Sequence, residues 1–188
     1  MAAEAESSTS LLGFLVFEKT SDATGYIAAL MVTDVRGYPL EFRATPPIRP
    51  SLVQRTLYGG QLENYIWAEL CGKALVQNAS RKPKIFLVPD KAMLELASTG
   101  PINIVAIHRA GESLKTQGGN AEAVRGTIEA NGATNQGIVY EASLSESESS
   151  QQITRLLQEC AMKFDLIEAF SRMRAAISLL GKEDKRFS

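Results

Sequence analysis

Asp90 lies where a buried strand turns directly into a helix, a position that can carry chemistry. The segment KIFLVPDKAMLEL, residues 84–96, has an apolar strand pattern that ends at this acid and is followed at once by a helical pattern. An aspartate at a helix start accepts hydrogen bonds from backbone amides and caps the helix. A carboxylate at a strand end can also hold a divalent cation, since hard cations prefer oxygen ligands. The cap is the commoner use, and both interpretations stay open.

Other chemical motifs are scarce. His108 is the only histidine, so a serine or cysteine triad has a single candidate base, and no GxSxG pattern occurs. The glycines of YGG and QGGN are typical of loops, and the sequence contains no phosphate-binding glycine motif. Cys71 and Cys160 lie inside helix-like apolar patterns, so we expect buried free thiols in a reducing compartment. The sequence therefore predicts no catalytic residue, no metal and no cofactor.

Four arginines and a tyrosine lie between a predicted turn and the end of the first predicted helix, on both sides of a proline-rich segment. Such a surface can contact phosphates or an acidic partner, or it can be ordinary solubilising charge. The formal net charge is −1 and the pI is near 5.9, so the net charge gives no electrostatic attraction to nucleic acid. We predict a binding surface made of Arg36, Arg43, Arg49, Arg55 and Tyr58.

The elements that must position these residues begin with three strands. Continuous apolar runs at 11–19 and 25–34 predict strands buried on both faces. Residues 38–45 alternate apolar and polar side chains after a turn signal, which predicts a hairpin with an edge strand beginning at Pro39. Ser51, with Gln54 three residues later, is a capping box that opens a helix.

The next elements alternate. A wide apolar stripe over 62–75 predicts a helix facing the core. Residues 84–90, 91–98 and 102–110 then read as strand, helix and strand, a rhythm that predicts parallel pairing through a helical crossover. The region 111–137 is rich in glycine and small polar residues, which predicts loops around one short strand or helix, and GIVYEAS predicts a last strand.

The C-terminal segment has the clearest periodicity in the chain. Its apolar residues are spaced by threes and fours from Ile153 to Leu180, which predicts an amphipathic helix. A continuous helix of about 28 residues would be about 42 Å long, longer than a small domain is wide. We therefore predict that part of its apolar face, including Phe164 and Phe170, contacts a partner.

Together these patterns predict an α/β domain with a mixed sheet flanked by helices. Hydrophobic residues at 45% and charged residues at 22% are typical of a soluble globular protein. No apolar run is long enough to cross a bilayer and no signal peptide is present, so we expect a cytoplasmic protein without a membrane partner. The predicted divisions are a tail at 1–10, the domain at 11–144, an acidic serine-rich linker at 145–150, the long helix at 151–181 and a charged tail at 182–188.

The order of a three-strand meander followed by alternating helices and strands resembles the ribonuclease-H-like superfamily over residues 11–110. That resemblance implies carboxylates on the first strand, on the first long helix and at the end of the fourth strand, which hold one or two Mg²⁺ or Mn²⁺ ions. Here those places hold Glu18, Glu63 (or Glu69) and Asp90. Asp165 or Glu168 would offer a fourth acid from the last helix. The first position is usually aspartate in active members, and the longer glutamate would displace the metal.

Two functions follow from these observations. Because no catalytic set is recognisable, the main prediction is a non-enzymatic interaction or scaffold subunit of a larger cytosolic assembly. It would bind another protein or a second copy of itself through the C-terminal helix and the arginine–tyrosine surface. The alternative is a divergent Mg²⁺- or Mn²⁺-dependent nuclease, or a nucleic-acid-binding protein, with a ribonuclease-H-like fold that uses Glu18, Glu63 and Asp90.

Overall fold

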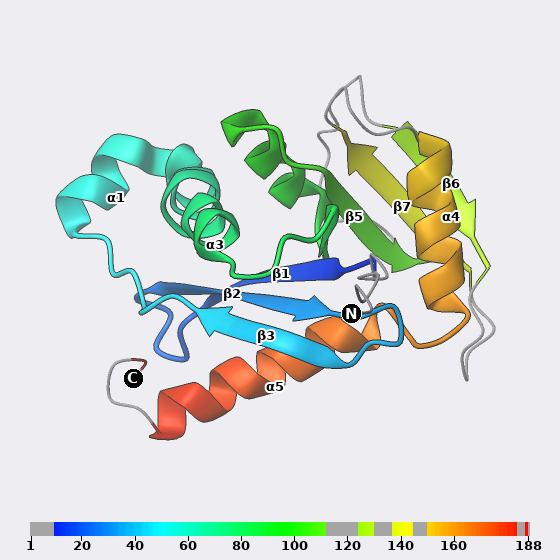
Figure 1. Cartoon of the computed structure of the whole chain (residues 1–188). Helices are drawn as coiled ribbons and strands as arrows, with labels where there is room; N and C mark the ends of the chain where they lie inside the picture. The colour runs from blue at the N-terminus through cyan, green and yellow to red at the C-terminus, as the bar shows by residue number, and fades with distance from the viewer. Residues whose placement is uncertain (1–9, 112–123, 130–136, 145–149, 184–186, 188) are drawn as a thin grey trace, which may run out of the picture.

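A seven-stranded mixed sheet forms the centre of the molecule (Figure 1). The computed structural model describes residues 10–111, 124–129, 137–144, 150–183 and 187. The strand order is β3-β2-β1-β4-β5-β7-β6, which confirms the predicted fold class. The strands are β1 (Leu12–Lys19), β2 (Tyr26–Thr33), β3 (Pro39–Ala44), β4 (Ile85–Val88), β5 (Ile104–Arg109), β6 (Val124–Ile128) and β7 (Ile138–Ser143).

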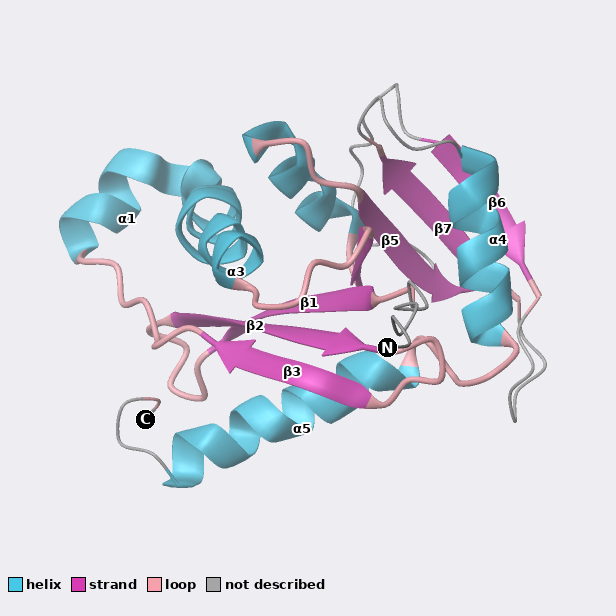
Figure 2. Cartoon of the chain, viewed as in Figure 1, coloured by secondary structure: helices cyan, strands magenta, loops and turns pink. Residues whose placement is uncertain are grey.

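Helices cover both faces of this sheet, as Figure 2 shows. One face carries the segment between β3 and β4 together with the turns that follow β4, and the opposite face carries the two C-terminal helices. The first group comprises α1 (Leu52–Tyr58), η1 (Gly59–Gln61), α2 (Leu62–Tyr65), the π-helical η2 (Ile66–Gly72), α3 (Lys73–Asn78) and the 3₁₀-helical η3 (Lys91–Thr99). The second comprises α4 (Ser150–Ala161) and α5 (Glu168–Glu183).

Strands β1 and β2 lie inside the sheet, as their continuous apolar runs predict. β1 pairs antiparallel with β2 and parallel with β4, so it has a neighbour on each side. Its side chains alternate between two cores: Phe14 and Val16 pack toward α4 and α5, whereas Leu15 packs toward η2. The apolar runs are continuous because both faces of these strands are buried.

The hairpin, the capping box and the parallel pairing are confirmed as well. β3 is an edge strand that begins at Pro39, where a missing amide donor costs no hydrogen bond within the sheet. Ser51 and Gln54 make the reciprocal capping bonds at the start of α1. β4 and β5 pair in parallel through η3, which is a 3₁₀ helix where an ordinary helix is predicted.

The predicted continuous C-terminal helix is wrong, because the segment forms two helices. The Asp165 carboxylate accepts hydrogen bonds from the amides of Ile167 and Glu168, at 2.9 and 3.3 Å, and begins α5 after a turn. The same carboxylate pairs with Arg109 at 2.6 Å. The bend lets α4 and α5 both pack on one sheet face, so the apolar periodicity continues across the turn.

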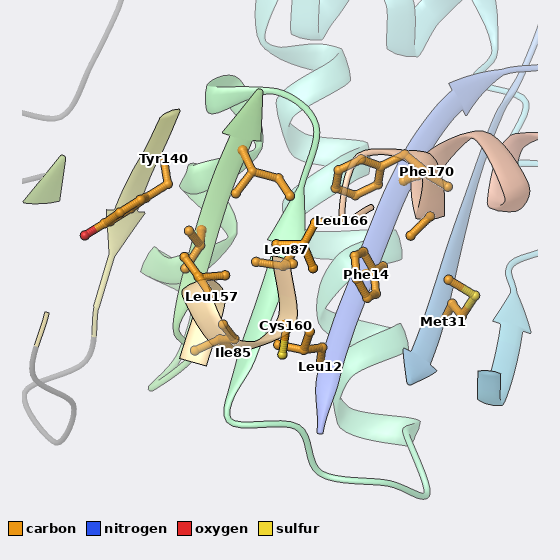
Figure 3. Packing of buried hydrophobic residues seen from close by; sticks show 14 of the residues in the cluster. Leu12, Phe14, Met31, Ile85, Leu87, Tyr140, Leu157, Cys160, Leu166 and Phe170 are labelled. Carbon is orange, nitrogen blue, oxygen red and sulfur yellow. The ribbon is translucent and has the colours of Figure 1, made fainter. Parts of the chain in front are cut away.

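The two phenylalanines predicted to face a partner pack against the sheet instead. Phe170 is 1% exposed and meets the Phe14 ring edge to face, with ring centroids 5.7 Å apart (Figure 3). Phe164 is half-buried, and a Cβ added at Gly37 would lie 2.6 Å from its ring, so it closes over the β2–β3 turn. The apolar stripe of the C-terminal segment is therefore core, and Phe170 is not part of a binding surface.

Some predictions fall outside the residues that the structure describes. These are the tail at 1–9, the linker at 145–149, residues 184–186 and 188 of the charged tail, and most of the region 111–137. Within that last region, β6 is the predicted short strand.

Cys71 and Cys160 are buried free thiols as predicted, and burial raises their pKa values to about 11 and about 12. In the described ranges, no helix is both long and apolar enough to cross a membrane.

Glu41 ties the edge strand to the turn after α3 and makes stability depend on pH. Its carboxylate pairs with Arg43 and accepts hydrogen bonds from the amides of Ser80 and Arg81, at 2.9 and 2.8 Å. Burial alone raises the pKa of Glu41, but these partners outweigh it and hold the pKa at about 2. Because the folded pKa is depressed, this stabilisation is present above the ordinary pKa of 4.5 and is lost as the pH falls toward 2.

We expect Glu41→Gln to lower the free energy of unfolding at pH 7 by about 1–3 kcal/mol, the usual cost of losing a charged hydrogen-bond partner. Urea unfolding at a series of pH values measures this loss, and the difference in free energy of unfolding between the variant and the wild type should disappear between pH 4.5 and 2. Glu95→Gln, at an exposed position on η3, is the matched control. A gap that stays constant with pH would contradict this role for the charge.

Candidate functional site

The carboxyl ends of β1 and β4 are the place where this sheet is suited to bind a ligand. These two strands are parallel neighbours, but the chain leaves β1 toward β2 and leaves β4 toward β5, on opposite sides. Open α/β sheets bind ligands at such a switch point, because the connections diverge and leave a crevice. Two cavities open at this end. One of about 320 Å³, the switch-point cavity, is lined by residues that include Phe17, Glu63, Trp67, Asp90 and Arg174.

The second cavity, of about 490 Å³, lies beside the turn between β1 and β2 and is called the turn cavity here. Its lining includes Glu18 and Lys19 from β1, Asp22 from the turn, and residues of α5. Arg174 of α5 lines both cavities. The two cavities are therefore neighbours at one end of the sheet, and Arg174 is shared between them.

The three predicted metal ligands are divided between the two faces of the sheet. Because side chains alternate along a strand, Glu18 has the parity of Phe14 and Val16 and points to the α5 face. There its carboxylate accepts a hydrogen bond from Arg174 Nε at 2.6 Å. Glu63 belongs to α2, on the other face. Glu18 is therefore not among the residues that line the cavity that Glu63 and Asp90 share, although its partner Arg174 is.

Glu63 is partnered by an ammonium group. Lys19 Nζ lies 2.6 Å from Glu63 Oε1, and the Tyr26 hydroxyl donates to the same oxygen at 3.2 Å. The hydrogen bond and the charge of Glu63 raise the pKa of Lys19, which therefore stays protonated. With side chains 57% and 50% exposed, the pair contributes little to stability. The positive charge beside Glu63 thus comes from the protein itself.

Asp90 acts as a helix cap. Its side chain accepts a hydrogen bond from the Ala92 amide at 2.9 Å and begins η3. Glu69, the other acid considered on the first long helix, pairs with Lys73, and Glu168 pairs with Arg172. Over the described part of the chain, no group of three or more histidine, cysteine, aspartate or glutamate side chains is placed to hold a metal ion. The acids that the family resemblance implies do not fit a metal centre here.

We expect Asp90→Asn to cost about 1 kcal/mol or less, because asparagine also caps helices and only the charge is lost. Thermal melts of wild type and variant, each with and without millimolar Mn²⁺, test this together with the metal site. Addition of Mn²⁺ should leave both melting temperatures unchanged. A rise with Mn²⁺ in the wild type that vanishes in the variant would show that Asp90 binds metal.

Aromatic rings form the wall between the switch-point cavity and the core. Phe17 stacks on Tyr26 with ring centroids 5.4 Å apart and lies 5.7 Å from Trp67. Trp67 is buried, and its indole nitrogen donates to the Met93 carbonyl at 3.2 Å. The apolar stripe over 62–75 predicted a buried Trp67, but no pattern predicted that these rings line a cavity, although the alternation in β1 places Phe17 on the same face as Leu15.

The predicted arginine–tyrosine surface is split by the fold. Arg36 pairs with Asp34 at the β2–β3 turn, and Arg43 pairs with Glu41 on the edge strand. Arg49 and Arg55 lie at the other end of β2, beside the β1–β2 turn, where Arg55 donates to the carbonyls of Thr24 and Pro50. Tyr58 packs on Tyr65 with ring centroids 4.7 Å apart. Of the four arginines, Arg49 and Arg55 are the two that lie near the carboxyl ends of β1 and β4.

The fold is similar to that of known nucleases. The endonuclease V of Bacillus subtilis superposes with a TM-score of 0.56 at 10% sequence identity, over 93% of this chain and 82% of that one. Ciona intestinalis endonuclease V in complex with inosine-containing DNA gives 0.44 at 10% identity, covering 90% and 86%. Marinitoga piezophila Argonaute in complex with guide RNA gives 0.41 at 8% identity, covering 78% and 25%. No protein-family model matches the chain. No curated protein matches it either.

The first of these likenesses supports the predicted resemblance to the ribonuclease-H-like superfamily at the level of the fold. It also corrects the main functional prediction. The non-enzymatic scaffold prediction is wrong, because the shared fold is that of an endonuclease and favours the nucleic-acid alternative. The C-terminal stripe on which the scaffold prediction depended is core.

Proposed function

We propose that this protein binds nucleic acid across the carboxyl ends of β1 and β4. The endonuclease-like fold supports the proposal, and one observation carries it. Four cationic side chains gather at this end of the sheet, from β1, from the crossing before α1 and from α5. They are Lys19, Arg49, Arg174 and Lys182, and all four line the turn cavity. Lysine and arginine at such an edge neutralise phosphates and release counterions, which dominates nucleic-acid affinity.

The local charge differs from that of the whole chain. Glu18 and Asp22 are the acids that line the turn cavity, and Glu63 is paired with Lys19, so the four cations exceed these three acids by one positive charge. The formal net charge of the protein is −1. A positive excess therefore lies at one end of the sheet, although the net charge of the whole chain is negative.

Exposed aromatic rings border the same end. Tyr58 and Tyr65 are 38% and 37% exposed on the segment that leads into the switch-point cavity. Rings of this kind stack on unpaired bases without regard to sequence. Single-stranded nucleic acid, whose bases are free to stack, suits this edge better than a duplex does.

The proposed binding uses no metal held by Glu18, Glu63 and Asp90. Glu18 and Glu63 are engaged by Arg174 and Lys19, from opposite faces of the sheet. A metal at these acids would have to displace both cations. The protein's own ammonium and guanidinium groups are therefore the charges that meet the phosphates.

A fluorescence anisotropy titration tests the proposal with labelled single-stranded DNA, single-stranded RNA and duplex DNA of about 20 nucleotides. We expect saturable binding, tighter for single strands, that weakens as salt rises with a slope of about −0.7 per neutralised phosphate. Failure to bind any of the three at low salt would overturn the proposal. So would an affinity that does not change with salt.

A further inference from the structure

Strand β3 leaves one edge of the sheet open for pairing. It is the last strand in the sheet order, and within the described residues no strand pairs with its outer side (Figure 1). The Thr45 amide donates to the Ala28 carbonyl of β2 at 2.9 Å. In an antiparallel pair every second residue bonds to the neighbouring strand, so Arg43 bonds toward β2, whereas the backbone groups of Phe42 and Ala44 face away from it. The outer edge of β3 therefore presents backbone donors and acceptors to another strand.

The same edge carries exposed apolar side chains. They are Tyr38, Leu40 and Phe42, with exposed fractions of 62%, 41% and 40%. Phe42 lies opposite Met31 of β2, so its ring is on the face of the sheet that α5 covers. Edge strands commonly prevent association with unpaired charges, but the two charged residues of β3, Glu41 and Arg43, pair with each other. The edge therefore joins apolar surface to backbone hydrogen-bonding groups and carries no net charge.

Charges and prolines favour one antiparallel register between two copies of β3. Hydrogen bonds form only where an outward-facing residue of one copy lies opposite an outward-facing residue of the other. A two-fold axis at Arg43 places two arginines opposite each other, and an axis at Glu41 does the same with two glutamates. An axis at Ala44 places Phe42 opposite Pro46, which has no amide to donate. With the axis at Phe42, Glu41 of each copy lies opposite Arg43 of the other.

The Glu41–Arg43 pair makes this register self-complementary. Arg43 is the accessible member, with a side chain 41% exposed against 10% for Glu41. The Glu41 carboxylate accepts three hydrogen bonds within its own copy, and a carboxylate has about four acceptor sites, so it can take one more from the second copy. Four charges of alternating sign then surround the axis, which is the charge pattern that stabilises facing strands.

We infer that two copies of this chain associate through their β3 strands, antiparallel across a two-fold axis at Phe42, so that the two seven-stranded sheets become one. The two Phe42 residues exchange backbone hydrogen bonds, and their rings lie next to each other on the α5 side of the joined sheet. The antiparallel pairing reverses the direction of every strand in the second copy. The carboxyl ends of β1 and β4 in the two copies therefore face opposite ways, and the dimer forms without nucleic acid.

Sedimentation velocity of the full chain without nucleic acid tests the dimer over a range of about 1 to 200 µM. One short strand from each copy is a small interface, so we expect a dissociation constant on the order of 10 µM. Phe42→Lys places two ammonium groups opposite each other at the axis and should weaken the dimer at least tenfold. Leu57→Lys, at a position 78% exposed on α1, is the matched control and should dimerise as wild type does. A wild type that stays monomeric throughout this range would overturn the inference.

Crosslinking tests the register without relying on the lysine variant. A short bismaleimide should join two copies of Phe42→Cys, because residues that face each other across the axis have Cβ atoms about 5 Å apart. In Tyr38→Cys the two thiols lie eight positions apart along the paired strands, roughly 27 Å, and should not be joined. Wild type is the blank, since its own two thiols are buried. Equal crosslinking of the two cysteine variants would overturn the inference, as would unchanged dimerisation of a folded Phe42→Lys.

Discussion

Replacing Phe170 with alanine is expected to destabilise the protein by about 3–5 kcal/mol, the usual cost of emptying a large aromatic position in a core. The ring is 1% exposed, contacts Phe14 edge to face and belongs to the core that α4 and α5 form against the sheet (Figure 3). Urea unfolding followed by circular dichroism measures the change, and the slope with denaturant should stay close to that of the wild type.

Leu179→Ala on the same helix is the matched control for Phe170→Ala. Leu179 is 54% exposed, so its loss should change the free energy of unfolding by less than about 0.5 kcal/mol. The pair distinguishes the core face of α5 from its solvent face. If Phe170→Ala left stability unchanged, the C-terminal stripe would not be core, and a contact with a partner would again have to be considered.

The second large effect is expected on nucleic-acid affinity. The double variant Lys19→Gln/Arg174→Gln removes two cations from the carboxyl edge, and we expect single-stranded binding to weaken by at least tenfold at about 100 mM salt. The slope of the logarithm of affinity against the logarithm of salt concentration should become shallower by about 1.4, because two phosphate contacts are lost. Anisotropy titrations at four or more salt concentrations measure both quantities.

The change in slope is the part of this result that a structural defect would not imitate. A variant that was merely less stable would bind less at every salt concentration with the slope of the wild type. Arg81→Ala/Arg155→Ala removes the same number of charges elsewhere and should keep the wild-type slope. Equal slopes for wild type and Lys19→Gln/Arg174→Gln would place the interface at another surface.

Local patterns predicted most of the elements, because the spacing of apolar residues along a strand or helix shows which of its faces is buried. Continuous apolar runs marked β1 and β2, and the Ser51–Gln54 pair marked the start of α1. The break between α4 and α5 was missed because both helices pack on one face, so the apolar spacing runs through the turn. Asp165 followed by Glu168 is itself a helix-start signal that would have located the break.

The candidate site was harder to predict, because it depends on contacts between distant segments. The order of elements predicted the nuclease-like fold, and the alternation in β1 already assigns Glu18 to the face opposite Leu15 and Phe17. The Lys19–Glu63 pair and the Arg174–Glu18 pair join segments 44 and 156 positions apart. No local pattern specifies such pairs, and they are the reason that the predicted acids do not assemble a metal site.

We propose that the carboxyl edge binds nucleic acid with the protein's own cations and without a metal held by Glu18, Glu63 and Asp90. The most direct test incubates the protein with end-labelled single-stranded DNA and RNA in EDTA or in millimolar Mn²⁺, and measures bound and cleaved fractions in the same samples. We predict equal binding in both conditions and no cleavage in either. Cleavage that requires Mn²⁺ and is lost in Asp90→Asn would contradict the account and establish a metal-dependent nuclease.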